Sequence, residues 1–149
     1  MIGDSKERPH QRLDVWRDAM DLVVMVYAHS GNFPGEERFG ITSQVRRAAV
    51  SVPSNIAEGA ARRSQAELVR FCVIARGSLS ELDTQLELAN RLGFAQPAPE
   101  LQRLLDRTFA RLNALIRSLE PTPRTVREEA ALYESPITNH ESPTTALPC

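Results

Sequence analysis

The sequence predicts an all-α protein, specifically an up-down-up-down antiparallel four-helix bundle with a mostly disordered C-terminal tail. Three observations support this fold. Apolar residues recur at the three- and four-residue spacings of amphipathic helices. The polar and apolar alternation of a half-buried strand is not sustained anywhere. Loop-like segments separate four such helical stretches. The 149 residues therefore divide into a flexible N-terminus (1–8), a bundle (9–120) and a tail (121–149).

The first helix is expected from about Pro9 to His29. One apolar stripe at spacings of 3, 4, 3 and 4 predicts its inward face, which consists of Leu13, Trp16, Met20, Val23 and Tyr27. Asp18 is expected on another face of this helix. We expect Trp16 and Tyr27 to be core residues first and interface anchors second.

The second helix follows a loop at residues 30–40 that is rich in glycine. Thr42 is its expected N-cap, and its end is expected near Ala60 or Ala61. Its inward stripe is Val45, Ala48, Val52 and Ile56. Pro53 interrupts this helix, where it removes one backbone hydrogen bond at a cost of roughly 3 kcal/mol. We therefore expect a bend, with Ser51, Ser54 and Asn55 bonding to backbone groups and the neighbouring small residues admitting a closely packed partner.

The third helix is expected to begin after Ser64, because Ser64 and Glu67 have the spacing of a capping box. Gly93 marks its end. Its inward positions have heptad spacing and are Leu68, Cys72, Ala75, Leu79, Leu82, Leu86 and Ala89. Gly77 and Ser78, in the middle of this helix, indicate a close helix crossing. The fourth helix extends to Pro121 with the inward stripe Leu101, Leu105, Thr108, Leu112, Leu115 and Leu119.

Beyond Glu120 the sequence contains five prolines, many serines and threonines, and no sustained periodicity. A short stretch from Val126 to Tyr133 has the composition for two helical turns and for docking on a neighbour. Isolated helices of this length are marginal in water.

Composition excludes several classes of protein. The longest apolar runs are far short of the roughly 20 residues that span a membrane, and the polar N-terminus does not resemble a signal peptide, so a cytoplasmic location is expected. The two cysteines fit neither a disulfide framework nor a metal site, and Cys72 is expected to be buried. The formal net charge of −1 argues against nucleic-acid binding through bulk positive charge.

Five arginines around the end of the second helix form the densest positive cluster and are the candidate nucleic-acid contacts: Arg46, Arg47, Arg62, Arg63 and Arg70. Glu58 and Glu67 lie among them. Because successive helical residues point about 100° apart, Arg46 and Arg47 do not fully share a face. A solvated surface or intersubunit ion pairs are the alternative interpretation.

Catalytic, cofactor-binding and metal-ligating motifs are not evident, and neither is a small-molecule substrate site. The three histidines are far apart in sequence, and the one Glu-x-x-His spacing, Glu7 to His10, is a single copy beside Pro9. Phosphate-cradling loops and a nucleophile elbow are also missing. We therefore expect a protein that is not an enzyme, and an active site assembled between subunits is a distant alternative.

Two long stretches, residues 13–37 and 39–94, resemble a family of bacterial four-helix bundle proteins first described from intervening sequences of ribosomal RNA genes. The resemblance extends from Leu13 to Leu119 and includes a relationship to the accessory variability determinant of diversity-generating retroelements. It implies a ring-like homopentamer without established enzymatic activity. The retroelement relatives bind nucleic acid and a reverse transcriptase through a strongly basic surface, whereas this chain is nearly neutral.

The leading hypothesis is thus a non-enzymatic, cytoplasmic, homo-oligomeric scaffold or adaptor, associated with RNA or with a partner that handles nucleic acid. The alternative is a protein that binds RNA or DNA directly through the five arginines. In an oligomer, a weak contact repeated in every subunit gains avidity.

Overall fold

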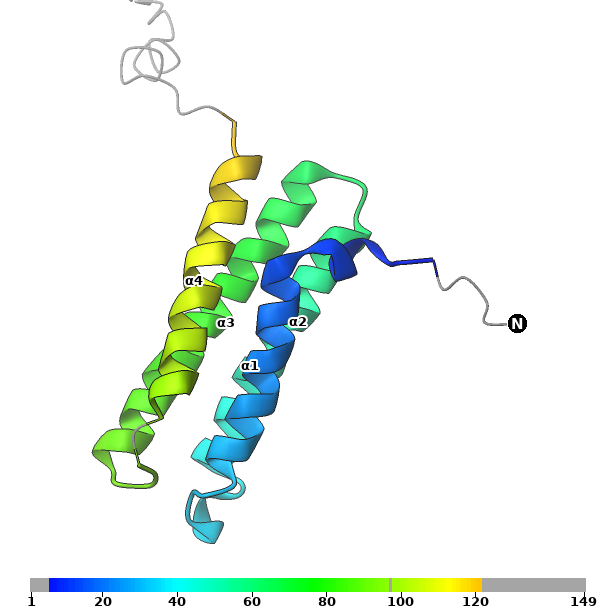
Figure 1. The fold of residues 1–149 in the computed structure, drawn as a ribbon. Helices are drawn as coiled ribbons and strands as arrows, with labels where there is room; N and C mark the ends of the chain where they lie inside the picture. The colour runs from blue at the N-terminus through cyan, green and yellow to red at the C-terminus, as the bar shows by residue number, and fades with distance from the viewer. Residues whose placement is uncertain (1–5, 97, 122–149) are drawn as a thin grey trace, which may run out of the picture.

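The computed structural model describes residues 6–96 and 98–121, and the predictions for residues 1–5 and for the tail from residue 122 lie outside this range. A 3-10 turn, η1 (Pro9–Arg12), precedes α1 (Asp14–Ser30). A second short turn, η2 (Gly35–Glu37), leads into α2 (Ile41–Ala61), which is followed by α3 (Gln65–Arg91) and α4 (Pro99–Leu119). The helices alternate in direction, as Figure 1 shows, and α1 and α3 each pack against both α2 and α4. The predicted antiparallel four-helix bundle is confirmed.

Leucine, valine, isoleucine and alanine from all four helices form the core. The predicted inward stripe of α2 is confirmed at all four positions. On α3, six of the seven predicted residues are buried and Leu68 is partly buried. Cys72 is fully buried, as expected. On α4 the stripe is confirmed through Leu112. Near the end of α4, however, Ile116 is buried in place of Leu115 and Leu119, which are partly exposed.

The predicted inward face of α1 is only partly correct, since Leu13, Trp16 and Val23 pack against the core but are only partly buried. Its buried stripe consists of Val15, Ala19, Leu22 and Val26, whereas Met20 and Tyr27 are 43% and 45% exposed. Asp18, which was expected on another face, is only 5% exposed. The reason is that α1 carries two apolar stripes with helical spacing, and periodicity alone does not tell which one faces the bundle.

Two predicted helix starts also need correction. Pro9–Arg12 is a separate 3-10 turn, because Leu13 has extended backbone angles (φ −88°, ψ 118°) and α1 begins only at Asp14. Thr42 is a buried residue inside α2 rather than its N-cap, which is Gly40. The free amide of Ile41 donates instead to the Glu37 carboxylate (3.3 Å), a favourable partner at the positive end of a helix.

Pro53 lies inside α2, as predicted, and its side chain is buried. The polar residues after it bond to backbone carbonyls one turn earlier: Ser54 Oγ donates to Val50 O (2.8 Å) and Asn55 Nδ2 donates to Ser51 O (2.8 Å). The carbonyl that lacks a helical donor because of Pro53 is that of Ala49, and these two side-chain bonds go to the two carbonyls that follow it. The helix continues from Ile41 to Ala61 through Pro53, and the expected bend stays a prediction.

The helices α2 and α3 approach each other closely near Gly59. A Cβ added there would lie 2.7 Å from Phe71 Cβ and 3.3 Å from Leu68 Cα, so the missing side chain is what permits the approach. Farther along, the hydroxyls of Ser51 and Ser78 are 2.7 Å apart and join the two helices. Ser78 therefore does mark a helix contact, but Gly77 does not, since a Cβ there would have no described heavy atom within 4 Å.

The ends of α3 follow the sequence signals. Ser64 Oγ accepts a hydrogen bond from the Glu67 amide (3.4 Å). The Glu67 carboxylate pairs with Arg70 rather than completing the capping box. At the other end, Gly93 has φ +74°, and the amides of Gly93 and Phe94 donate to Asn90 O and Ala89 O, which is a Schellman motif. Across the described residues, none of the helices is both long and apolar enough to traverse a bilayer.

Candidate functional site

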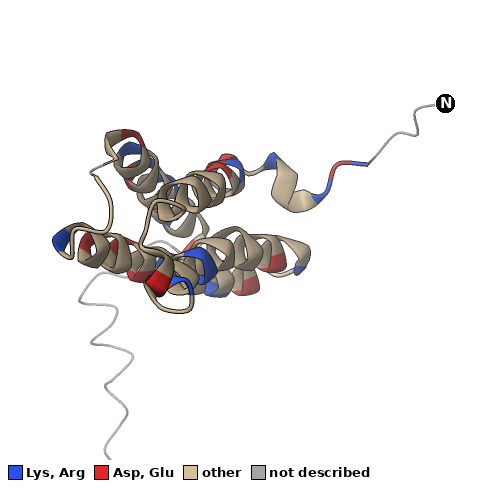
Figure 2. Ribbon diagram, turned by 90° about the horizontal axis from the view of Figure 1, so that it is seen from below, with Lys and Arg blue, Asp and Glu red and all other residues tan. Residues whose placement is uncertain are grey.

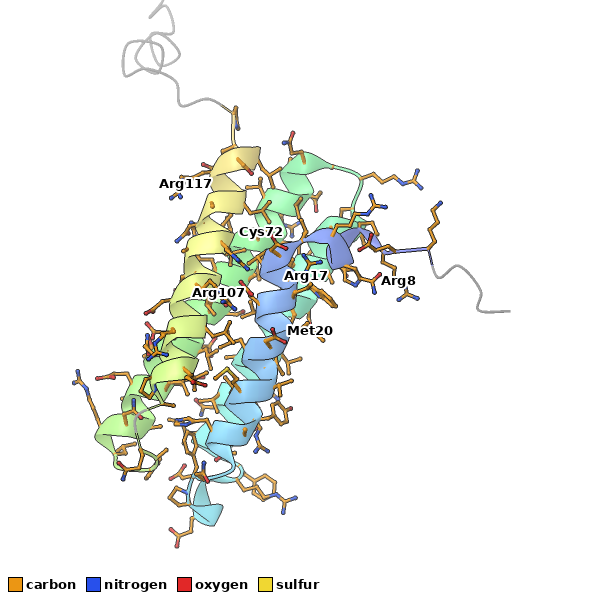
Figure 3. The ribbon with its side chains drawn as sticks, in the orientation of Figure 1. Arg8, Arg17, Met20, Cys72, Arg107 and Arg117 are labelled. Carbon is orange, nitrogen blue, oxygen red and sulfur yellow. The ribbon has the colours of Figure 1, made fainter. Side chains whose placement is uncertain are left out.

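Two residues of the stripe first expected in the core, Met20 and Tyr27, belong to an exposed apolar surface on α1 and α2. Val24 is 69% exposed, and Met20, Tyr27 and Val50 are each between 41% and 45% exposed. Tyr27 and Val50 line a common hollow of about 470 Å³ together with Phe39, which is 89% exposed. We call Met20, Val24, Tyr27, Phe39 and Val50 the outer apolar face. Met20 lies on the side of α1 that is turned away from α4 (Figure 3).

The second half of α1 is apolar around its whole circumference. The seven residues Leu22–Ala28 carry no charge, although the protein's own core covers only one side of the helix. A helix that is apolar all round is normally buried on all sides. Contiguous exposed apolar surface of this kind marks interaction sites in soluble proteins. The outer apolar face is therefore a candidate interaction surface.

Arg46 lies at one edge of the outer apolar face. Its Nε donates to Ser30 Oγ (2.9 Å), its Nη2 donates to Tyr27 O (3.3 Å), and its guanidinium carbon lies 4.6 Å from the centroid of the Tyr27 ring. The side chain is partly buried by these contacts. Arg46 thus joins α1 to α2 and orients Tyr27, while Arg47 next to it is exposed.

The other predicted arginines gather at the turn between α2 and α3. The guanidinium carbons of Arg62 and Arg70 lie 5.4 and 5.5 Å from the centroid of the Phe71 ring. Each is also paired with a carboxylate, Arg62 with Glu58 (2.9 Å) and Arg70 with Glu67 (3.4 Å). Arg63 is exposed, and none of the described acidic residues forms an ion pair with it. We call Arg62, Arg63 and Arg70 the turn arginines.

The structure does not bring the five predicted arginines together. Arg46 and Arg62 are separated by sixteen residues of one helix, which corresponds to about 24 Å along its axis. The turn arginines lie at one end of the bundle, while Arg46 and Arg47 lie toward the other. The expected single cluster is therefore two separate groups, because residues that are close in sequence spread along a helix.

Charge is distributed unevenly along the bundle axis. The half with the α2–α3 turn comprises residues 6–21, 51–78 and 107–121, and it contains eleven basic and seven acidic residues. The other described half contains five basic and seven acidic residues. Although the net charge is near zero, the bundle thus has a positive end and a negative end. Every helix carries both signs, as Figure 2 shows from below, so the asymmetry is axial rather than confined to one helix.

Sequence reasoning missed the buried carboxylate of Asp18. Its Oδ1 lies 3.1 Å from Arg107 Nη2, and its Oδ2 lies 2.7 Å from Arg111 Nη1. Arg107 lies on the side of α4 that faces α1 (Figure 3). The signal in the sequence was the pair of arginines four residues apart on α4, but their partner is about ninety residues away.

The described residues offer little that resembles a catalytic or metal centre. Across residues 6–96 and 98–121, His, Cys, Asp and Glu side chains do not group in threes as metal ligands would. Burial raises the pKa of the Cys72 thiol to about 11, which makes it a poor nucleophile at neutral pH. Burial also lowers the pKa of His29, which therefore favours its neutral form. His29 packs edge-on against the Phe33 ring, with centroids 5.6 Å apart.

Comparison with known proteins identifies one family. The model of the 23S rRNA-intervening sequence protein family matches residues 11–116, a range that starts in η1 and ends in the last turn of α4. The match includes both the outer apolar face and the turn arginines. No match was found among curated proteins.

Proposed function

The chain belongs to the 23S rRNA-intervening sequence protein family, and on that basis we propose a non-enzymatic, homo-oligomeric scaffold or adaptor. The outer apolar face supports this proposal. A second copy of the chain is its occupant, in line with the ring-like homopentamer that the family resemblance implies. The protein acts in the cytoplasm, and its role is to present the same surface several times.

The chemistry of the outer apolar face suits a permanent contact. Burying apolar side chains contributes roughly 25 cal/mol per Å² removed from water. Val24 and Tyr27 are large, lie one turn apart on α1 and are exposed in the single chain, so self-association would remove much of their surface from water. Tyr27 is already held in place by Arg46, so that little side-chain freedom is lost on contact.

Light scattering on the full chain tests this proposal. We expect an assembly larger than a monomer at micromolar concentration and its dissociation by Val24→Glu, which places a charge in the contact. The matched control is Leu92→Glu, because Leu92 is also an exposed apolar residue (60%) but lies beyond the C-terminus of α3. A monomeric unmodified protein, or equal effects of both substitutions, would contradict the proposal.

A second candidate function is direct contact with RNA or DNA, and the axial charge asymmetry favours it. A near-neutral protein can still bind phosphates if its basic residues gather at one end. Arg63 is free of ion pairs among the described residues, and Arg62 and Arg70 flank an aromatic ring at the same turn. A cyclic assembly with parallel subunits would bring several such turns onto one face.

A salt-dependent binding assay with single-stranded RNA and duplex DNA tests this second function. The turn arginines changed together to Ala should weaken binding and make the salt dependence less steep, by about one unit of slope for each phosphate that the variant no longer binds. Arg46 and Arg47 changed to Ala form the second arm, which separates the two groups of predicted arginines. Absence of binding at about 50 mM salt, where phosphate contacts are strong, rules this function out.

A further inference from the structure

The basic end of the bundle carries a groove that the four helices do not fill. It has a volume of about 620 Å³ and lies between the start of α3 and the end of α4. We call it the end groove, and it is lined by Gln65, Ala66, Val69, Ser118, Leu119 and Pro121, together with Glu120. Val69 and Leu119 are only partly buried, so apolar surface at this end of the core is still accessible.

The chain itself continues from this groove. Pro121 is both a lining residue and the last described residue, and 28 residues follow it. Figure 1 shows the chain leaving the bundle at the upper end of α4, beside the start of α3. Residue 126 lies five residues beyond Pro121, which is a reach of at most about 18 Å. A tether this short gives a local concentration in the millimolar range.

The composition of residues 126–133 complements this end of the bundle. Val126, Ala130 and Tyr133 are apolar and follow one another at spacings of four and three, while Glu128 and Glu129 lie between them. Residues 122–149 as a whole contain two arginines and four glutamates, whereas the half of the bundle that they adjoin has an excess of four basic residues. Ala66 in the groove is one helical turn from Arg70.

We propose that residues 126–133 dock in the end groove of their own chain and that Glu128 and Glu129 then screen the turn arginines. The apolar residues supply the contact with Val69 and Leu119, and the carboxylates face the basic rim. The tail is thus an intramolecular competitor for anions at this end. The screening rests on the second function proposed above, whereas the docking does not.

Disulfide trapping in the full chain tests the docking. Ala66→Cys is combined with Ala130→Cys, and Cys149→Ser removes the thiol at the end of the tail. Cys72 does not interfere, since it is buried within the core. We expect this pair to cross-link within one chain at least about tenfold faster than a control pair, Ala66→Cys with Thr145→Cys. Equal rates, or cross-links that form only between chains, overturn the docking.

Two further variants in the trapping background identify the forces involved. Val126→Ser with Tyr133→Ser should reduce the rate to that of the control pair, because serine cannot replace the apolar packing against Val69 and Leu119. Glu128→Gln with Glu129→Gln should reduce the cross-linking rate less at 500 mM salt than at 50 mM salt, since dissolved ions already weaken charge pairing at high salt. Unchanged rates in both variants overturn the assigned contacts.

Binding of single-stranded RNA tests the screening separately. The full chain with Val126→Ser and Tyr133→Ser should bind RNA several-fold more tightly than the unmodified chain at low salt. Unchanged affinity of a protein that does bind RNA overturns the screening. Trapping of the disulfide in a protein that does not bind RNA overturns the nucleic-acid function and the screening with it, and supports the docking.

Discussion

Asp18 Oδ2 on α1 lies 2.7 Å from Arg111 Nη1 on α4, and the second oxygen of the same carboxylate bonds to Arg107. The carboxylate is almost fully buried, while the two guanidinium groups reach it from the surface and remain about half exposed. A buried charge is tolerated when it is paired and hydrogen-bonded. This pair of bonds fixes α4 against α1, two helices that the chain does not connect directly.

Replacing Asp18 tests the strength of this connection. Asp18→Asn keeps the shape but removes the charge that both arginines share, so we expect the free energy of unfolding to fall by about 1–3 kcal/mol. Urea denaturation measures this change. The control is Asp14→Asn, an exposed aspartate one turn earlier in α1 that pairs with Arg17 at the surface and should change stability by less than about 1 kcal/mol. Equal effects of the two substitutions would show that the buried connection adds nothing.

The sequence predicted the helices better than their orientation. The stripes of α2 and α3 were largely correct because each helix has one continuous apolar stripe, and its charged residues lie outside that stripe. On α1 the prediction was only partly correct, because Val15 and Leu22 on one stripe compete with Met20 and Tyr27 on another. Which of two apolar stripes is buried depends on contacts with distant helices, and a single sequence does not contain those contacts.

Two glycines in neighbouring helices should respond oppositely to alanine. At Gly59 the added Cβ would lie 2.7 Å from Phe71 Cβ, so α2 and α3 must separate, and we expect Gly59→Ala to destabilise the protein by about 1–3 kcal/mol. At Gly77 the methyl would enter open space, and alanine favours helix, so Gly77→Ala should stabilise by about 0.5–1 kcal/mol. Thermal melts of both variants check the prediction. Destabilisation by Gly77→Ala would indicate that another chain packs closely there.

The candidate site could be predicted only in part. The basic residues at the α2–α3 turn are contiguous in sequence, and the turn keeps Arg62 and Arg63 near Arg70. Arg46 was grouped with them because it is close to Arg62 in sequence. The helix, however, places Arg46 about 24 Å from Arg62 along its axis. The pairing of Arg46 with Tyr27 joins two helices and had no local signal.

The buried thiol of Cys72 should be almost unreactive in the folded protein. Burial leaves it inaccessible and raises its pKa to about 11, so very little thiolate is present at pH 8. In a Cys149→Ser variant, in which Cys72 is the remaining cysteine of the sequence, we expect labelling by a thiol reagent to be at least about 100-fold slower than in urea. Labelling at the rate of a free peptide thiol would show that this part of α3 opens readily.

Asp83 lies in the acidic half of the bundle, and its carboxyl group has a raised pKa. The first cause is desolvation by burial, followed by repulsion from Asp106 on α4 and Glu87 on α3. A folded-state pKa above the unfolded value of 3.8 means that the native state binds the proton more tightly than the unfolded state does. The stabilisation that comes from protonating Asp83 is therefore complete below pH 3.8. It is lost as the pH rises through the folded-state pKa. At neutral pH the charged form therefore opposes folding.

Asp83→Asn should consequently stabilise the protein at pH 7. The gain is a few tenths of a kcal/mol, because the side chain is exposed and solvent screens its repulsion. The difference in free energy of unfolding between variant and unmodified protein should shrink as the pH is lowered toward 3.8, since both side chains are then neutral.

Asp106→Asn should reproduce part of the gain, and the two substitutions together should give less than the sum of their effects, because each removes the same repulsion. Urea denaturation at pH 7 and at pH 4.5 measures these differences, and a gain that stays constant between the two pH values would rule out repulsion as its cause.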